Sequence, residues 1–191
     1  MEVTSALAPI YHAPLGEFLA RRKELAARLK KAGERELADK VAKLPKPTPA
    51  AWAVNQLALR APDEIARLAE LGAQLRGVMR AGLAGDVAAK DQLVACEAAQ
   101  RRHVGALVER ARALLSEQAL SSDVALDRVK TTLTTISITG AWGGAAPGQL
   151  SKELEPPGVE QMAELLMLGA EPSPPVPRAP AAAALRVAGP S

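Results

Sequence analysis

Lys46-Pro-Thr-Pro-Ala-Ala-Trp-Ala-Val-Asn-Gln-Leu57 is the segment of this chain whose local structure is most closely specified by its residues. Each proline disfavours the helical conformation of the residue before it, so Lys46 and Thr48 are expected to be extended. Thr48 can then act as an N-cap, and Pro49 suits the first position of a helix, where its missing N–H costs nothing. We therefore predict a helix over residues 49–60 that ends before Pro62.

This predicted helix is apolar around nearly its whole circumference. At about 100° per residue, Trp52 and Leu59 share one face, whereas Val54 and Leu57 lie roughly opposite. A helix that is apolar on all sides is typical of positions surrounded by other helices. We expect residues 49–60 to form the central helix of the domain.

Asn55 and Gln56 are the amide side chains of this central helix, and they flank the Trp52 face. They favour hydrogen bonds to neighbouring backbone, because a buried amide without a partner costs about 1–3 kcal/mol. The alternative is that Trp52, Asn55 and Gln56 line a small polar site beside the indole. The sequence leaves both interpretations open.

The composition favours an all-α fold. The 191 residues include one Phe, one Tyr and two Trp, and they are rich in Ala and Leu, which suits close-packed helices better than a sheet. The length fits one domain with a hydrophobic core. We predict a bundle of six to seven helices with antiparallel neighbours.

Helical periodicity and capping residues divide the rest of the chain. Residues 1–13 are predicted to be an irregular lead-in, residues 14–168 the helical domain, and residues 169–191 a disordered Pro/Ala-rich tail. Besides the central helix, the pattern predicts helices over residues 14–31, 34–44, 62–81, 87–118, 122–136 and 159–168.

Two features of the later chain remain ambiguous. Residues 131–139 are rich in β-branched side chains, so the part beyond residue 133 is compatible with either a helix or an extended strand. Trp142 lies in a glycine-rich loop over residues 140–148. It is expected to dock on its own domain, or alternatively to anchor a partner, because tryptophan is enriched among the residues that dominate interfaces.

The assembled pattern resembles an uncharacterised family of bacterial all-helical proteins. The matching segments are Leu15-Gly-Glu-Phe18 with Arg22 and Leu25, the block from Lys46 to Leu57, Arg101-Arg102, Thr132-Leu133, and Glu153-Leu-Glu-Pro-Pro-Gly158. Together they span residues 11–165, and the tryptophan–asparagine block is the distinctive one. The resemblance implies a helical architecture and no particular chemistry.

The sequence contains no phosphate-binding glycine loop, metalloprotease helix or nucleophile elbow. Cys96 and His103 are seven residues apart on one predicted helix, about 10 Å along its axis, which is too far for a nucleophile–base hydrogen bond. We expect no enzymatic activity, no cofactor and no metal site. A single cysteine, and the absence of a secretory signal or a long apolar run, indicate a cytoplasmic protein that does not enter membranes.

Positive charge is concentrated in the first part of the chain, where residues 1–50 carry ten Lys and Arg against six Asp and Glu. The candidate basic patch on the predicted helix over residues 14–31 comprises Arg21, Arg22, Lys23, Arg28, Lys30 and Lys31. Such a patch could bind nucleic-acid phosphates, or it could be a solvated helix face. We favour a non-enzymatic interaction or scaffold protein whose partner is a protein, with nucleic-acid association as the alternative.

Overall fold

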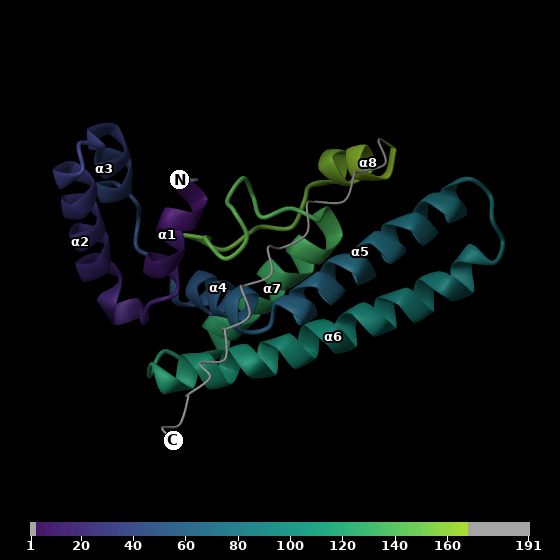
Figure 1. The fold of residues 1–191 in the computed structure, drawn as a ribbon. Coiled ribbons are helices and arrows are strands. Elements are labelled where there is room, and N and C mark those ends of the chain that lie inside the picture. The colour runs from purple at the N-terminus through teal and green to yellow at the C-terminus, as the bar shows by residue number, and fades with distance from the viewer. Residues whose placement is uncertain (1–2, 168–191) are drawn as a thin grey trace, which may run out of the picture.

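The computed structural model describes residues 3–167, with the side chains described from residue 7 onward, and over this range the chain is all-α (Figure 1). The elements are α1 (Val3–Tyr11), the 3-10 turn η1 (Leu15–Glu17), α2 (Phe18–Lys31), α3 (Arg35–Ala42), α4 (Pro49–Arg60), α5 (Pro62–Leu83), α6 (Ala89–Glu117), α7 (Asp123–Thr139) and α8 (Val159–Met167). The predicted all-α fold is confirmed. The predicted tail lies outside the described residues.

Helix α4 is the centre of the main core, as predicted. The Thr48 hydroxyl accepts a hydrogen bond from the backbone N–H of Ala51 at 3.2 Å, and Pro49 occupies the first turn. Every residue from Ala50 to Ala58 is buried. Helices α5, α6 and α7 all pack against α4, so the helix is enclosed on several sides.

Helices α5 and α6 form a long antiparallel hairpin, and α7 packs across both of them (Figure 1). The main core lies among α4, α5, α6 and α7, and it also takes in residues from the loop after α7. Its members include Trp52, Leu57, Leu68, Leu107, Leu133 and Trp142. The far end of the hairpin, where α5 turns into α6, extends beyond α4 and α7.

A second, smaller hydrophobic cluster lies among α1, α2 and α3. We call it the N-terminal cluster; its buried members are Ile10, Tyr11, Phe18, Leu25 and Val41. The rings of Tyr11 and Phe18 meet edge to face with centroids 5.5 Å apart, a favourable geometry for aromatic pairs. The first three helices therefore have a core of their own.

The prediction that residues 1–13 are irregular is wrong, because Val3–Tyr11 form helix α1 with Pro9 inside it. Proline in a helix removes a backbone hydrogen bond, which is why the sequence favours an irregular segment. Ile10 and Tyr11 are almost fully buried in the N-terminal cluster. Tertiary packing of this kind supplies most helical stability in proteins, and here it outweighs the local preference.

The ambiguity over residues 131–139 is resolved in favour of helix, since α7 continues to Thr139. Thr132, Thr135 and Ser137 are buried on several sides of α7. The hydroxyl of Thr139 donates to the carbonyl of Thr135 at 2.8 Å, and Gly140 ends the helix in the left-handed conformation at φ 69°. The extended alternative is therefore incorrect.

Helix α8 follows an irregular segment and packs on α5 without fully burying any of its residues. Among the helices described, none combines the length and apolarity needed to cross a membrane.

Candidate functional site

Asn55 is wholly buried, and both the nitrogen and the oxygen of its side-chain amide form hydrogen bonds with the loop that follows α7. The Asn55 Nδ2 donates to the carbonyl of Leu150, and the Asn55 Oδ1 accepts from the Leu150 N–H, each at 2.8 Å. This pair of bonds joins α4 to a backbone segment ninety-five residues away. Asn55 therefore acts as a structural clamp.

Trp52 and Gln56 bind the segment between α1 and η1. The Trp52 Nε1–H donates to the carbonyl of Ala13 at 2.8 Å, and the Gln56 Nε2 donates to the carbonyls of Tyr11 and His12 at 3.2 and 3.3 Å. These bonds attach the N-terminal cluster to the main core. The hydrogen bonds of Trp52 and Asn55 agree with the structural interpretation of these side chains. Gln56 also donates to backbone, but its Oε1 is buried without a hydrogen-bond partner in the described structure, so the polar site beside the indole stays a prediction.

Trp142 is only 6% exposed and belongs to the main core. The loop after α7 folds back over α4, and Leu150 of the same loop is buried beside it. The interpretation of Trp142 as an anchor for a partner is therefore wrong, because the indole already fills a space within its own domain.

The six candidate basic residues do not form one patch. The guanidinium of Arg22 donates to the carbonyl of Leu44 and so ties α2 to the end of α3. Arg21 forms an ion pair with Glu17 at 2.8 Å. At 100° per residue, the pair Lys23 and Lys30 lies about 120° around α2 from the pair Arg28 and Lys31.

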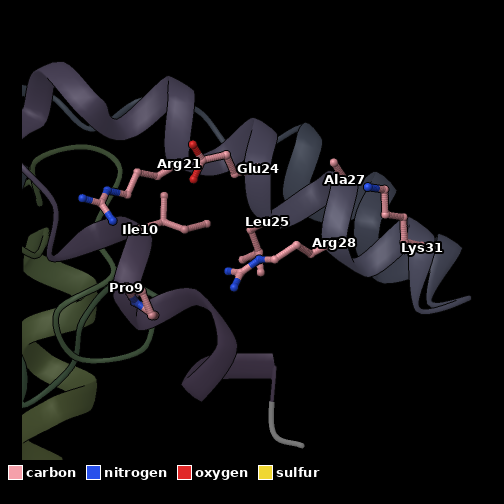
Figure 2. A pocket seen from close by; sticks show the side chains of 8 residues that line it. All are labelled: Pro9, Ile10, Arg21, Glu24, Leu25, Ala27, Arg28 and Lys31. Carbon is pink, nitrogen blue, oxygen red and sulfur yellow. The ribbon is translucent and has the colours of Figure 1, made fainter.

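Arg21, Arg28 and Lys31 line a groove between α1 and α2 with a volume of about 470 Å³. We call it the α1–α2 groove; its other lining residues are Pro9, Ile10, Glu24, Leu25 and Ala27. Figure 2 shows Leu25 and Arg28 of α2 and Ile10 of α1 along the same gap, with Lys31 farther along α2. The groove thus combines apolar walls with a basic margin.

The charge of the groove is positive and partly uncompensated. Arg28 and Lys31 make no ion pair or hydrogen bond through their side chains within the described part of the chain. They also lie in the last turn of α2, where cations interact favourably with the helix dipole. Glu24 offsets only part of this charge. The arrangement suits a ligand that presents carboxylates next to aliphatic groups.

No catalytic constellation stands out among the residues described. His103 is held by the backbone carbonyl of Glu64 at 2.8 Å, and Cys96 is half-buried elsewhere on the same helix. Between residues 3 and 167, no group of three or more His, Cys, Asp or Glu side chains is arranged to hold a metal ion. The predictions about enzymatic activity and cofactors remain predictions.

The sequence analysis missed Arg76, which is buried to 6% exposure where α5 crosses α7. Its Nη1 donates to the carbonyls of Ser137 and Ile138 at 2.9 and 2.7 Å, so a cation satisfies the C-terminal end of α7. Burial, with a contribution from Arg80, lowers the pKa of Arg76. The sequence feature that could have identified Arg76 is its position four residues after Gly72, which places it on the inward row of the helix.

Comparison with models of known protein families, with curated protein sequences and with solved structures finds no match to this chain. The α1–α2 groove is therefore interpreted from its own residues.

Proposed function

We propose that the protein is a non-enzymatic interaction protein and that its α1–α2 groove binds an acidic, amphipathic segment of a partner protein. The observation that carries the proposal is the combination of an apolar wall, formed by Ile10 and Leu25, with the unpaired cations Arg28 and Lys31. An amphipathic helix or extended peptide places apolar and acidic side chains at matching intervals.

The apolar wall supplies affinity and the cations supply specificity in this proposal. Leu25 is 8% exposed and Ile10 2% exposed, so they form the buried base of this wall, and the exposed Pro9 and Ala27 provide apolar surface that an aliphatic side chain can contact. Arg28 can donate two parallel hydrogen bonds to a carboxylate, which fixes the orientation of the ligand as well as its charge. Electrostatic complementarity of this kind favours acidic partners and accelerates their association.

Nucleic-acid binding is the second candidate, and it rests on the basic residues of α2. Two observations make it the weaker one. Single-stranded nucleic acids are usually bound on exposed aromatic rings, whereas Tyr11, Phe18, Trp52 and Trp142, the four aromatic residues of the sequence, are all buried. The candidate basic residues are also spread around the circumference of α2, which reduces the charge available to one phosphate backbone.

The test uses a photo-crosslinking residue at the groove. We would place p-benzoylphenylalanine at Ala27, an exposed residue that lines the groove, and, as a control, at Leu19, which is exposed on α2 and does not line the groove. The expected result is a crosslinked protein at position 27 that is absent at position 19. Peptide mapping should then place the crosslink in an acidic, amphipathic segment of the captured protein.

A charge-reversal pair makes the same test specific for the groove. Arg28→Glu with Lys31→Glu should abolish the crosslink, whereas Lys23→Glu with Lys30→Glu changes the net charge equally and should preserve it. A crosslinked product that nuclease digests would contradict the proposal and favour nucleic acid. Equal loss in the two double variants would show that overall charge, and not the groove, governs binding.

A further inference from the structure

A second cavity lies between the end of α7, the irregular segment before α8, and α8 itself. Its volume is about 520 Å³, within the range of sites that hold small ligands. It shares no residue with the α1–α2 groove. The residues that matter for its chemistry are Thr135, Thr139, Leu154, Glu155, Glu164 and Leu165.

Much of the cavity wall is aliphatic. Leu154, from the segment before α8, and Leu165, from α8, are both half-buried. Leu154 also packs on the main core and lies against Gly143, where a Cβ atom would fall 2.5 Å from its Cδ2. Leu154 is therefore held in place, and it gives the cavity a firm apolar side that an alkyl chain can contact.

Two carboxylates stand at this apolar cavity without a counter-charge. Glu155 and Glu164 are exposed, and neither makes an ion pair or a side-chain hydrogen bond within residues 3–167. Glu153, two residues before Glu155, pairs instead with Arg128 at 3.2 Å. The negative charge at the cavity is thus available to a cationic ligand.

The third feature is a buried hydroxyl without a partner. Thr135 lines the cavity from α7, is 5% exposed, and has an Oγ1 that makes no hydrogen bond in the described structure. The neighbouring hydroxyl of Thr139 differs, because it donates to the carbonyl of Thr135. An unpaired buried hydroxyl is unfavourable. The Oγ1 has less than 1 Å² of accessible surface, so a ligand can reach it only after Thr135 rotates about χ1, and a hydrogen bond donated to it would then reduce this penalty.

We propose that this cavity binds a small amphipathic cation, a primary alkylamine in its ammonium form. The alkyl chain lies against Leu154 and Leu165, and the ammonium group lies between the carboxylates of Glu155 and Glu164. After rotation of Thr135 about χ1, one of the three N–H donors of the ammonium group is directed to its Oγ1. The carboxylates alone, or the aliphatic wall alone, would fit many ligands. The ligand class is defined by their combination with the Thr135 Oγ1, an acceptor that lacks a partner in the described structure.

Calorimetric titration of the full chain at neutral pH with three six-carbon probes tests the charge requirement. The probes are n-hexylammonium chloride, sodium hexanoate and 1-hexanol, which share the alkyl chain and differ in the head group. The expected result is binding of hexylammonium, with NMR shifts of the methyl groups of Thr135 and Leu165, and at least tenfold weaker binding of the other two. Equal binding of hexanoate or hexanol, or no binding of hexylammonium, would overturn the proposal.

Matched variants test the site itself. Glu155→Gln and Glu164→Gln should each weaken hexylammonium binding about threefold, as expected for partly exposed charge pairs. Glu160→Gln, an equal change on α8 outside the cavity, should leave it unchanged. An equal loss in Glu160→Gln would show that general surface charge is responsible and would contradict the proposed site.

Thr135→Val separates ligand binding from folding. Valine keeps the shape of threonine and removes the unpaired hydroxyl, so the variant should melt at the same temperature as the wild type or higher. Hexylammonium binding should nevertheless fall about tenfold, because a hydrogen bond to a charged group is lost. Unchanged binding in a folded Thr135→Val protein would remove Thr135 from the site and overturn the proposed pose.

Discussion

Gly72 lies so close to Ser137 that a Cβ atom at position 72 would fall 1.8 Å from the Ser137 carbonyl oxygen. Helices α5 and α7 therefore cross with their backbones nearly in contact. The Ser137 hydroxyl donates to the carbonyl of Leu68 and accepts from the Gln100 Nε2, each at 3.0 Å. Three helices thus meet through polar groups at a crossing that admits no side chain on α5.

Gly72→Ala is expected to lower the free energy of unfolding by about 3 kcal/mol or more, because backbone atoms must move apart. Gly77→Ala, on the same helix with nothing within 4 Å of the new Cβ, is the control. It should raise the free energy of unfolding by about 1 kcal/mol through helix propensity. Urea denaturation of both variants measures the difference, and equal effects would contradict the close crossing.

Asn55→Ala is expected to destabilise the protein by about 2–4 kcal/mol, since it leaves both the N–H and the carbonyl of Leu150 buried without a partner. The exposed Gln74→Ala on α5 should change stability by less than about 0.5 kcal/mol. Thermal and urea unfolding check both values. A stability loss at Asn55 no larger than that at Gln74 would show that the clamp to Leu150 contributes little.

Trp52→Phe removes the donor to the Ala13 carbonyl while keeping an aromatic ring in the core. The unpaired carbonyl alone should cost about 1–3 kcal/mol. The NMR signals of Ile10 and Tyr11, in the N-terminal cluster, should shift more than those of Leu107 in the main core. Uniform shifts across both clusters would argue against a local link between Trp52 and the segment at Ala13.

Trp142→Ala is expected to lower the free energy of unfolding by about 3–5 kcal/mol, as for other large-to-small changes in a core. Val124→Ala is the control, because Val124 is 62% exposed and should tolerate truncation. The measurement is the urea midpoint at constant denaturant slope. Unchanged stability in Trp142→Ala would show that the Trp142 side chain does not pack in the main core.

His12 gives the stability a pH dependence of defined sign. Burial lowers the pKa of His12 below its usual 6.5, so the unfolded chain binds a proton more readily than the folded one. The contribution of neutral His12 is complete above about pH 6.5 and is lost as the pH falls through the folded pKa. The stability of the wild type should therefore fall relative to that of His12→Gln between pH 8 and pH 5.

Comparison with His12→Gln isolates this effect, because every other titratable group is the same in the two proteins. The two stability curves should run parallel above about pH 7 and converge or cross below pH 6.5. Parallel curves over the whole range would show that His12 is equally accessible to protons in the folded and unfolded states.

Local chemistry made α4 predictable. Thr48 and Pro49 specify its start, Pro62 its end, and the all-round apolarity of the helix its central place. The same local rules failed for α1, where Pro9 disfavours helix and the packing of Ile10 decides the outcome. They also did not decide whether the end of α7 is helical or extended. The β-branched threonines there favour an extended strand, whereas the hydrogen bonds and burial that favour a helix arise only when the helices assemble.

The candidate groove was predictable only in part. The sequence identified Arg28 and Lys31 as basic residues of one helix, together with Lys23 and Lys30, which do not line the groove. It could not show the groove, because the second wall is α1 and that segment was predicted to be irregular. The missed Arg76 has a similar cause: its acceptors, the carbonyls of Ser137 and Ile138, lie more than sixty residues away.

The division between the N-terminal cluster and the main core has a consequence for how the molecule opens. Helices α1 to α3 pack on one another, and their described links to the rest include Leu15 in the main core and the hydrogen bonds from Trp52 and Gln56. Such a junction lets the first three helices detach as one cooperative unit while α4 to α7 stay folded. Both walls of the α1–α2 groove belong to that unit, so a bound partner would stabilise α1 to α3 and leave the intrinsic stability of α4 to α7 unchanged.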